Sequence, residues 1–271
     1  MNTRKIENII IIILVLLNLF LLAVVLSDHA QARRSQRETA ETVTALLAEN
    51  GIQAAPEALQ LGAAPPICTV TRDLEREADR TESLIGSAGV EDLGGSIRFY
   101  RGEGGQIVLR GTGEMDMLPA GGSVPVRGSR EKTAQKLFAD AGAETCVWRV
   151  SEAEERVECC CLWDGLPVYN ARLAFDFSGD SLFMVTGTML FTRETERKSE
   201  GVMDAVSVLM RFLEYIRSEG LICSRLDAVS PGYLMAVTVS GESTLTPVWH
   251  IETDTGDYYM NAVSGKAETV D

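Results

Sequence analysis

The longest hydrophobic stretch of the chain lies close to its start. Residues Ile9 to Leu26 run without a charge, and with Ile6 the stretch approaches the ~20 apolar residues that cross a bilayer core as a helix. The pattern therefore predicts a transmembrane helix at residues 6–26. A cleaved signal peptide is the alternative, because Ala30-Gln31-Ala32 has the small-x-small form of a cleavage site, although the apolar core of a signal peptide is usually shorter.

The orientation of this helix is less strongly indicated than its insertion. Basic residues flank the apolar run on both sides: Arg4 and Lys5 before it, and Arg33, Arg34 and Arg37 after it. Large C-terminal domains translocate largely regardless of charge. We therefore expect residues 1–5 in the cytoplasm, the rest of the chain outside the cell, and the protein in the cell membrane as a single-pass, signal-anchored molecule.

Three segments beyond the apolar run carry hydrophobic residues at helical spacing and end at a glycine. The first covers Thr42 to Asn50, after a polar juxtamembrane stretch. The second follows Ser129, a predicted N-cap, and the third runs from Val202 to Ile216. The glycines that close the three predicted helices are Gly51, Gly142 and Gly220.

Strand patterns follow the second and the third helix. After Gly142 the segments 144–151, 156–163, 167–177 and 181–191 predict two hairpins, and alternation along 169–177 indicates a sheet with one covered face. After Gly220 we expect strands at 222–230, 232–240, 246–253 and 258–265. The turns expected in this second set are Pro231-Gly232 and Asp254-Thr255-Gly256.

The region from 53 to 128 is less regular. A charged helix is expected at about 72–85, then a hairpin of 96–102 and 106–112, and a glycine-rich linker at 117–126. The fold class is therefore α+β, with repeated units of a helix and an antiparallel sheet. The expected divisions are a juxtamembrane helix with a membrane-proximal unit at 27–128, a second unit at 129–195 and a third at 196–271.

Charge and composition limit the classes of function that the chain could have. Hydrophobic residues make up 45% of the chain and charged residues 24%, as in folded proteins, and the net charge is −14. Such an acidic surface repels phosphate backbones, which argues against nucleic-acid binding.

Six cysteines occur, three of them adjacent in the strand-like run VECCCLW: Cys68, Cys146, Cys159, Cys160, Cys161 and Cys223. The adjacent three alternate between two faces of a strand, so they cannot converge on one metal ion, and we interpret them as buried small hydrophobic residues. A disulfide between Cys146 and one of the three could form if their strands pair, since export would permit it. Sequence does not give that connectivity.

Few residues have the pattern of a catalytic site. Asp254-Thr255-Gly256 resembles an aspartic-peptidase motif, but its place between two strands favours a hairpin turn. His250 alternates with Trp249 and Ile251, so we expect it on the solvent face of its strand, although it could also serve a catalytic group. Signatures of serine hydrolases and nucleotide-binding loops do not occur. We therefore predict no catalytic, cofactor-binding or metal-binding residues.

Asn18 is out of character in the apolar run. Its amide would gain a hydrogen bond of about 0.6–2 kcal/mol against another transmembrane helix, so it favours helix association. A single asparagine facing lipid or a water defect is the alternative, because one uncharged polar side chain does not prevent insertion.

The chain resembles the YycI/YycH-type regulators of the WalK/WalR cell-wall two-component system. The resemblance rests on the glycine-ended helices and on two motifs: Leu17-Asn18-Leu19-Phe20-Leu21-Leu22, and Pro247-Val248-Trp249-His250-Ile251 with Gly256, Tyr258, Asn261-Ala262 and Gly265. It implies PepSY-like α+β units outside the membrane of a Gram-positive-type bacterium. The partners it implies are a WalK-like sensor histidine kinase and a YycH-like sister regulator, contacted in part through the membrane helix, where Asn18 and Phe20 are the candidate residues. The triple cysteine and the acidic ectodomain depart from the family.

Two functions follow from these observations. The first is a non-enzymatic, membrane-anchored accessory regulator of a sensor kinase that acts by contact through its transmembrane helix and its ectodomain. The second is a surface-anchored PepSY-like protease inhibitor, another extracytoplasmic binding protein or an anchored enzyme, and an enzyme would require a cleft with converging carboxylates.

Overall fold

The structure is a computed structural model, which describes residues 38–237 and 242–270. The expected membrane segment at 6–26, with Asn18 and Phe20, lies outside the described residues. Within those residues, no helix is both long and apolar enough to cross a bilayer. Helices and a large, mostly antiparallel sheet make up the described chain, so the α+β class is confirmed.

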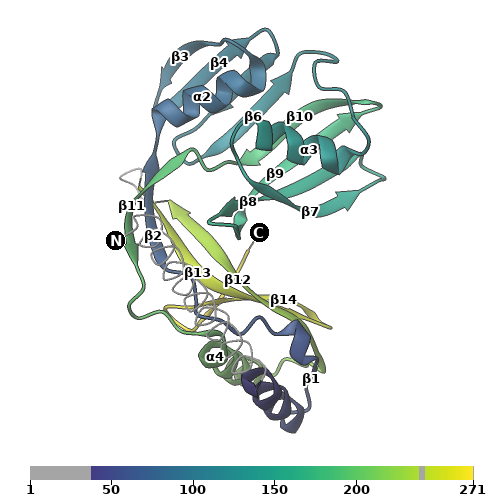
Figure 1. Ribbon diagram of the computed structural model, residues 1–271, viewed down its shortest axis with the longest axis vertical. Helices are drawn as coiled ribbons and strands as arrows, with labels where there is room; N and C mark the ends of the chain where they lie inside the picture. The colour runs from purple at the N-terminus through teal and green to yellow at the C-terminus, as the bar shows by residue number, and fades with distance from the viewer. Residues whose placement is uncertain (1–37, 238–241, 271) are drawn as a thin grey trace, which may run out of the picture.

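The upper part of the molecule in Figure 1, which we call the large lobe, is an eight-stranded antiparallel sheet with two helices on one face. The helices are α2 (Leu74–Ile85) and α3 (Arg130–Asp140). The strands, in spatial order, are β7 (Thr145–Ser151), β8 (Arg156–Trp163), β9 (Leu166–Ser178), β10 (Ser181–Thr188), β6 (Glu114–Pro119), β5 (Gly105–Leu109), β4 (Ile97–Gly102) and β3 (Gly89–Gly94). Phe138 of α3 and Phe175 of β9 are fully buried between the layers.

The lower part, the small lobe, is a second sheet with α4 (Ala205–Ser218) and a helix at 38–49 on its outer face. Val43 and Leu47 of the first helix share a core with Phe212 of α4 and Trp249 of the sheet. The strands, in spatial order, are β1 (Gln53–Ala54), β12 (Arg225–Val237), β13 (Glu242–Thr253), β14 (Gly256–Asn261) and β15 (Ala267–Glu268), and a 3-10 turn at Pro56–Ala58 precedes β2.

Backbone pairing joins the two lobes. Strand β2 (Ile67–Arg72) lies between β11 (Thr192–Lys198) and the start of β13. Strand β12 pairs in parallel with β9 at Tyr233 and Val168, and the amide side chain of Asn170 exchanges two 2.8 Å hydrogen bonds with the backbone of Met235. Strand β6 pairs with β10. Strands from both sides of residues 128 and 195, the expected boundaries between units, therefore belong to one continuous sheet.

The predicted helix ends agree with the structure. Ser129 accepts a hydrogen bond from the Lys132 N–H and caps α3, and the three closing glycines adopt the positive φ values that favour glycine: Gly51 (+80°), Gly142 (+71°) and Gly220 (+65°). Helix α4 begins at Ala205, later than the expected Val202, because Asp204 accepts from the Ser207 N–H and fixes the start.

The expected turn at Pro231-Gly232 is wrong, because β12 runs straight through it. Glycine is required here because β9 approaches the backbone of β12 closely. A Cβ at Gly232 would lie 2.4 Å from Cε2 of Tyr169 and 2.7 Å from the carbonyl oxygen of Pro167. The small lobe therefore has one long strand where the sequence suggested two short ones.

The linker expected at 117–126 is also wrong in its first part. Residues 117–119 belong to β6, in which Met115 and Met117 are fully buried. The strands β2, β3 and β11 were not expected. All six residues of β3 are exposed and β11 is mostly charged and exposed, so neither carries the alternation that marks a half-buried strand.

Candidate functional site

Four aromatic rings meet where the two lobes face each other. Trp148 of β7 and Tyr169 of β9 come from the large lobe, and His250 of β13 and Tyr259 of β14 come from the small lobe; we call these four residues the seam. The His250 ring centroid lies 4.9 Å from that of Tyr169 and 5.8 Å from that of Trp148. The guanidinium of Arg172 lies 4.8 Å from the Trp148 ring centroid. The seam is thus a direct contact between lobes.

His250 is the most unusual residue of the seam, because its side chain is only 4% exposed. Its Nδ1 lies 3.5 Å from Oε1 of Glu252, and its Nε2 lies 3.7 Å from Oδ2 of Asp257. Within the described chain, Nε2 has no hydrogen-bond partner. Burial lowers the pKa of His250 below its usual 6.5, and the nearby carboxylates of Asp257 and Glu252 oppose that shift.

The two tyrosines of the seam are also held in their uncharged form. Burial raises the pKa of Tyr259 to about 12 and raises the pKa of Tyr169 still further. The Tyr169 hydroxyl lies 3.3 Å from Oγ of Ser230. Near neutral pH the four rings are therefore uncharged, and Arg172 supplies a positive charge beside them. Such a cluster holds two lobes together and gains a charge at His250 only in acid.

The sequence prediction for His250 was wrong. Its neighbours Trp249 and Ile251 do point to the small-lobe core, and His250 does point to the opposite face. That face is covered by Trp148 and Tyr169 of the large lobe instead of water. Alternation within one strand shows which residues share a face. Whether the second face is exposed to solvent depends on segments that are distant in the chain.

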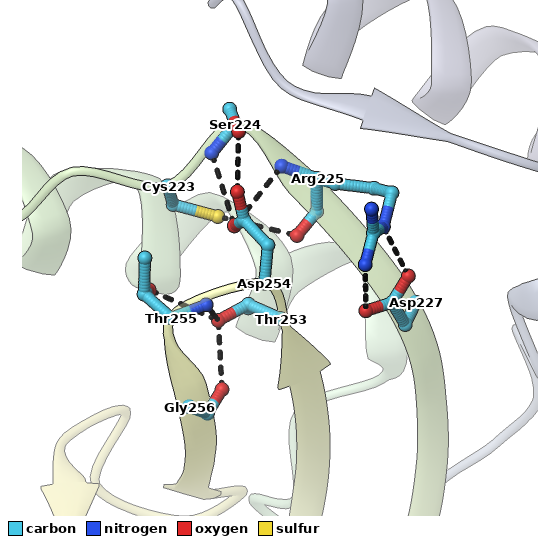
Figure 2. Close-up of polar contacts among 8 residues, drawn as sticks. All are labelled: Cys223, Ser224, Arg225, Asp227, Thr253, Asp254, Thr255 and Gly256. Carbon is cyan, nitrogen blue, oxygen red and sulfur yellow. Dashed lines mark hydrogen bonds and ion pairs between the residues drawn. The ribbon is translucent and has the colours of Figure 1, made fainter.

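The Asp254-Thr255-Gly256 segment is the hairpin turn that the sequence predicted. It joins β13 to β14, and the Asp254 carboxylate accepts hydrogen bonds from the Ser224 hydroxyl and from the backbone N–H groups of Ser224 and Arg225, the latter two at 3.2 Å (Figure 2). Thr253 Oγ1 donates to the Gly256 carbonyl oxygen at 2.7 Å. We call Asp254, Ser224 and Arg225 the clasp, because they fasten this turn to the start of β12.

The charges of the clasp differ from those of an aspartic dyad, in which two carboxyl groups share one proton. The hydrogen bond from Ser224 lowers the pKa of Asp254. The second carboxylate in Figure 2, Asp227, is bound by Arg225 at 2.5 Å, and that bond lowers its pKa as well. Both groups are ionised at neutral pH, so this arrangement does not support peptidase chemistry.

The three adjacent cysteines are buried, as the sequence predicted, and they divide between two faces of β8. Cys159 and Cys161 point into the large-lobe core, whereas the Cys160 thiol donates to the Val168 carbonyl oxygen at 3.0 Å. All six cysteines are reduced in the structure. Among the described residues, no group of three or more His, Cys, Asp or Glu side chains is placed to hold a metal ion.

One open hollow of about 310 Å³ lies at the start of α3. Arg130 and Arg156 line it, but both are already paired: Arg130 contacts Glu155 at 2.5 Å, and Arg156 contacts Asp176 at 2.6 Å. With both arginines paired and its mouth open to solvent, this hollow has little to offer a small ligand.

Comparison with known proteins gives a distant structural likeness only. No family model and no curated protein sequence matches the chain. A crystal structure of an uncharacterized protein from Eubacterium rectale is 11% identical, with a TM-score of 0.47 over 78% of this chain and 86% of that one. The C-terminal domain of Bacillus megaterium YpeB is 10% identical, with a TM-score of 0.41 over 74% of this chain and 97% of that one.

Proposed function

We propose that this chain is a membrane-anchored, extracytoplasmic regulator that acts by contact with a sensor histidine kinase. The observation that carries the proposal is the uncharged apolar run Ile9–Leu26, interrupted only by Asn18 and followed by a folded α+β region. The sister regulator and the WalK-like kinase are the partners that the family resemblance suggests. The role itself requires binding and no chemical step.

The anchor would hold the folded region close to the bilayer. Residues 27–37 separate the apolar run from the helix at 38–49, and at full extension they reach at most ~40 Å. That helix packs on α4 through Val43 and Leu47, so the tether enters the small lobe first. The small lobe would therefore sit nearest the membrane. The seam and the β2–β11 pair would connect it to the large lobe, which would lie further from the bilayer.

Regulation through a membrane helix requires a contact that differs between two states of the kinase. Asn18 is the one polar side chain in the run, and a hydrogen bond from it to a kinase helix would contribute ~0.6–2 kcal/mol. Coupling of 1–3 kcal/mol is typical of allosteric effects, so a contact of this size is enough to change kinase output several-fold. Phe20 lies two residues further, on the opposite side of such a helix, and would contact a second transmembrane helix of the kinase.

The test uses the full-length chain in native membranes, with a photocrosslinking amino acid at position 20 and with Asn18→Leu. We expect a crosslink to a multi-spanning histidine kinase, and a several-fold change in kinase phosphorylation in Asn18→Leu with an unchanged ectodomain. Leu19→Ile is the matched control, because residue 19 would lie about 100° around the helix from both residue 18 and residue 20.

Three outcomes would contradict the proposal. The first is the absence of a kinase crosslink together with unchanged phosphorylation. The second is a mature protein that is found in the medium and starts after Ala32, because it would have no anchor. The third is capture of a secreted peptidase by the ectodomain in place of the kinase, which would support the protease-inhibitor alternative.

A further inference from the structure

Strand pairing selects one partner for Cys146 among the three adjacent cysteines. In the antiparallel pair β7–β8, Cys146 lies directly opposite Cys160. Residues in direct register have Cβ atoms ~4.5–5.5 Å apart, close to the separation that a disulfide requires. Cys159 and Cys161 lie opposite Val147 and Thr145 and point into the large-lobe core, so they face away from Cys146.

The two thiols already contact each other. The single S–H of Cys160 is shared between the Cys146 sulfur and the Val168 carbonyl oxygen, which lies 3.0 Å from the Cys160 sulfur. Arg172, the register partner of Cys160 on β9, adds a positive charge on the other side. A thiolate at Cys146 is therefore stabilised by the hydrogen bond from Cys160, and the nearby cation favours a thiolate at Cys160.

The two cysteines differ in access and in proton affinity. Cys146 is half-buried and lies on β7, an edge strand that pairs only with β8 in the described chain, whereas Cys160 is fully buried. The hydrogen bond from Cys160 lowers the pKa of Cys146 to about 7, whereas the same bond and burial raise that of Cys160. Burial raises the pKa of Cys159 and Cys161 to about 12.

We propose that Cys146 and Cys160 form a thiol–disulfide exchange site that reacts with external disulfides, with Cys146 as the attacking thiol and Cys160 as the resolving thiol. The Cys146 thiolate attacks one sulfur of a disulfide R–S–S–R and forms a mixed disulfide, releasing one R–S⁻. The Cys160 sulfur then attacks the Cys146 sulfur, and its proton passes to the departing R–S group, because Cys160 is buried from solvent. The second R–SH leaves, so the two cysteines are oxidised and the external disulfide is reduced to two thiols.

Closure of this disulfide would act on the contact between the lobes. Cys146 lies two residues before Trp148, which β7 contributes to the seam. In the reduced protein, β8 is the one described strand that pairs with this edge strand, whereas the oxidised protein would hold β7 to β8 covalently as well. We expect slower amide exchange along β7 and a higher melting temperature after oxidation.

The test uses the reduced full-length chain in detergent micelles, with oxidised glutathione as the disulfide. Peptide mapping of the wild-type protein should show a Cys146–Cys160 crosslink and no lasting glutathione adduct. Cys160→Ala should retain one glutathione on Cys146, and Cys146→Ala should form neither product. Cys159→Ala is the matched control and should still form the crosslink.

The pH dependence of the reaction adds a second readout that does not need a variant. The rate at which the free Cys146 thiol is consumed should rise with pH up to about 7 to 8 and then level off, whereas the Cys223 thiol, whose pKa is raised by burial, should be consumed at least tenfold more slowly at pH 7. A mapped disulfide between other cysteines would overturn the proposal. Equal rates at Cys146 and Cys223 in the wild-type protein would also overturn it.

Discussion

The imidazole ring of His250 lies parallel to the phenol ring of Tyr259, with ring centroids 4.7 Å apart and ring planes only 9° apart. The two residues are register partners on β13 and β14, so the stack is a cross-strand pair on one face of the small-lobe sheet. Tyr169 covers this pair from the large lobe. Protonation of His250 would therefore place a charge in the contact between the lobes.

We expect the seam to weaken in acid. Because burial lowers the pKa of His250, the unfolded chain binds a proton at this residue at a higher pH than the folded chain does. The free energy of unfolding should therefore fall as the pH drops below about 6.5, and the fall should end once the folded protein is also protonated. Urea unfolding at pH 7 and pH 5 measures this change.

The matched variant for this experiment is His250→Phe, which keeps a flat ring on Tyr259 and removes the titration. Carboxylates contribute to acid sensitivity in both proteins, so the difference between them isolates His250. The variant should lose less free energy of unfolding between pH 7 and pH 5 than the wild type. An equal loss in the two proteins would show that His250 does not sense acid.

Gly232 is predicted to be intolerant of any side chain. A methyl group there would clash with the Tyr169 ring and the Pro167 carbonyl oxygen, where β12 meets β9. Overpacking of this kind typically costs ~1–3 kcal/mol, so Gly232→Ala should lower the midpoint of urea unfolding. Gly89→Ala is the control, because a Cβ at Gly89 meets nothing within 4 Å. Equal midpoints for the two variants would mean that β12 and β9 separate easily.

Local features of the sequence predicted most of the regular structure. The Ser129 cap, the closing glycines and the ends of β8 follow from hydrogen bonds and periodicity within a few residues. The Asp254 turn follows from its place between two strands. Such features depend on neighbours in the chain, so a single sequence is enough to identify them.

The errors share one physical cause, which is contact between segments far apart in the chain. Gly232 was interpreted as a turn residue because the approach of Tyr169 cannot be inferred from its neighbours. The solvent-facing expectation for His250 failed because Trp148 covers it. The choice of Cys160 as the partner of Cys146 likewise required the register of β7 on β8, which the sequence left open.

A buried ion pair joins α2 to β2, the strand that connects the two lobes. Glu77 is 1% exposed and accepts from Arg72 at 2.6 and 2.9 Å and from the Tyr100 hydroxyl at 2.8 Å. Removal of one partner of a buried pair typically costs ~3–5 kcal/mol, because the other charge stays buried. Glu77→Gln should therefore lower the free energy of unfolding by about that amount in urea titrations.

Two further variants test the origin of this effect. Asp79→Asn makes the corresponding change at an exposed position of α2 and should change stability by less than ~0.5 kcal/mol. The double variant Arg72→Met with Glu77→Leu removes both charges and should recover part of the loss, since an apolar pair leaves no unpaired charge. If the double variant loses as much free energy of unfolding as Glu77→Gln or more, the unpaired buried charge is not the source of the cost.

The clasp predicts a structural role for Asp254. Asp254→Ala removes the acceptor for the Ser224 hydroxyl and for two backbone N–H groups, so the β13–β14 turn would lose its attachment to β12. We expect a lower melting temperature by circular dichroism with the fold retained, and an intermediate value for Asp254→Asn, which keeps one acceptor oxygen. Because the clasp is exposed, water partly replaces the hydrogen bonds that the variant loses. The decrease in melting temperature should therefore be smaller than that of Glu77→Gln.

An Asp254→Ala protein that melts at the wild-type temperature would show that the turn holds without the clasp. A decrease larger than that of Glu77→Gln would show that the clasp also supports the small-lobe core.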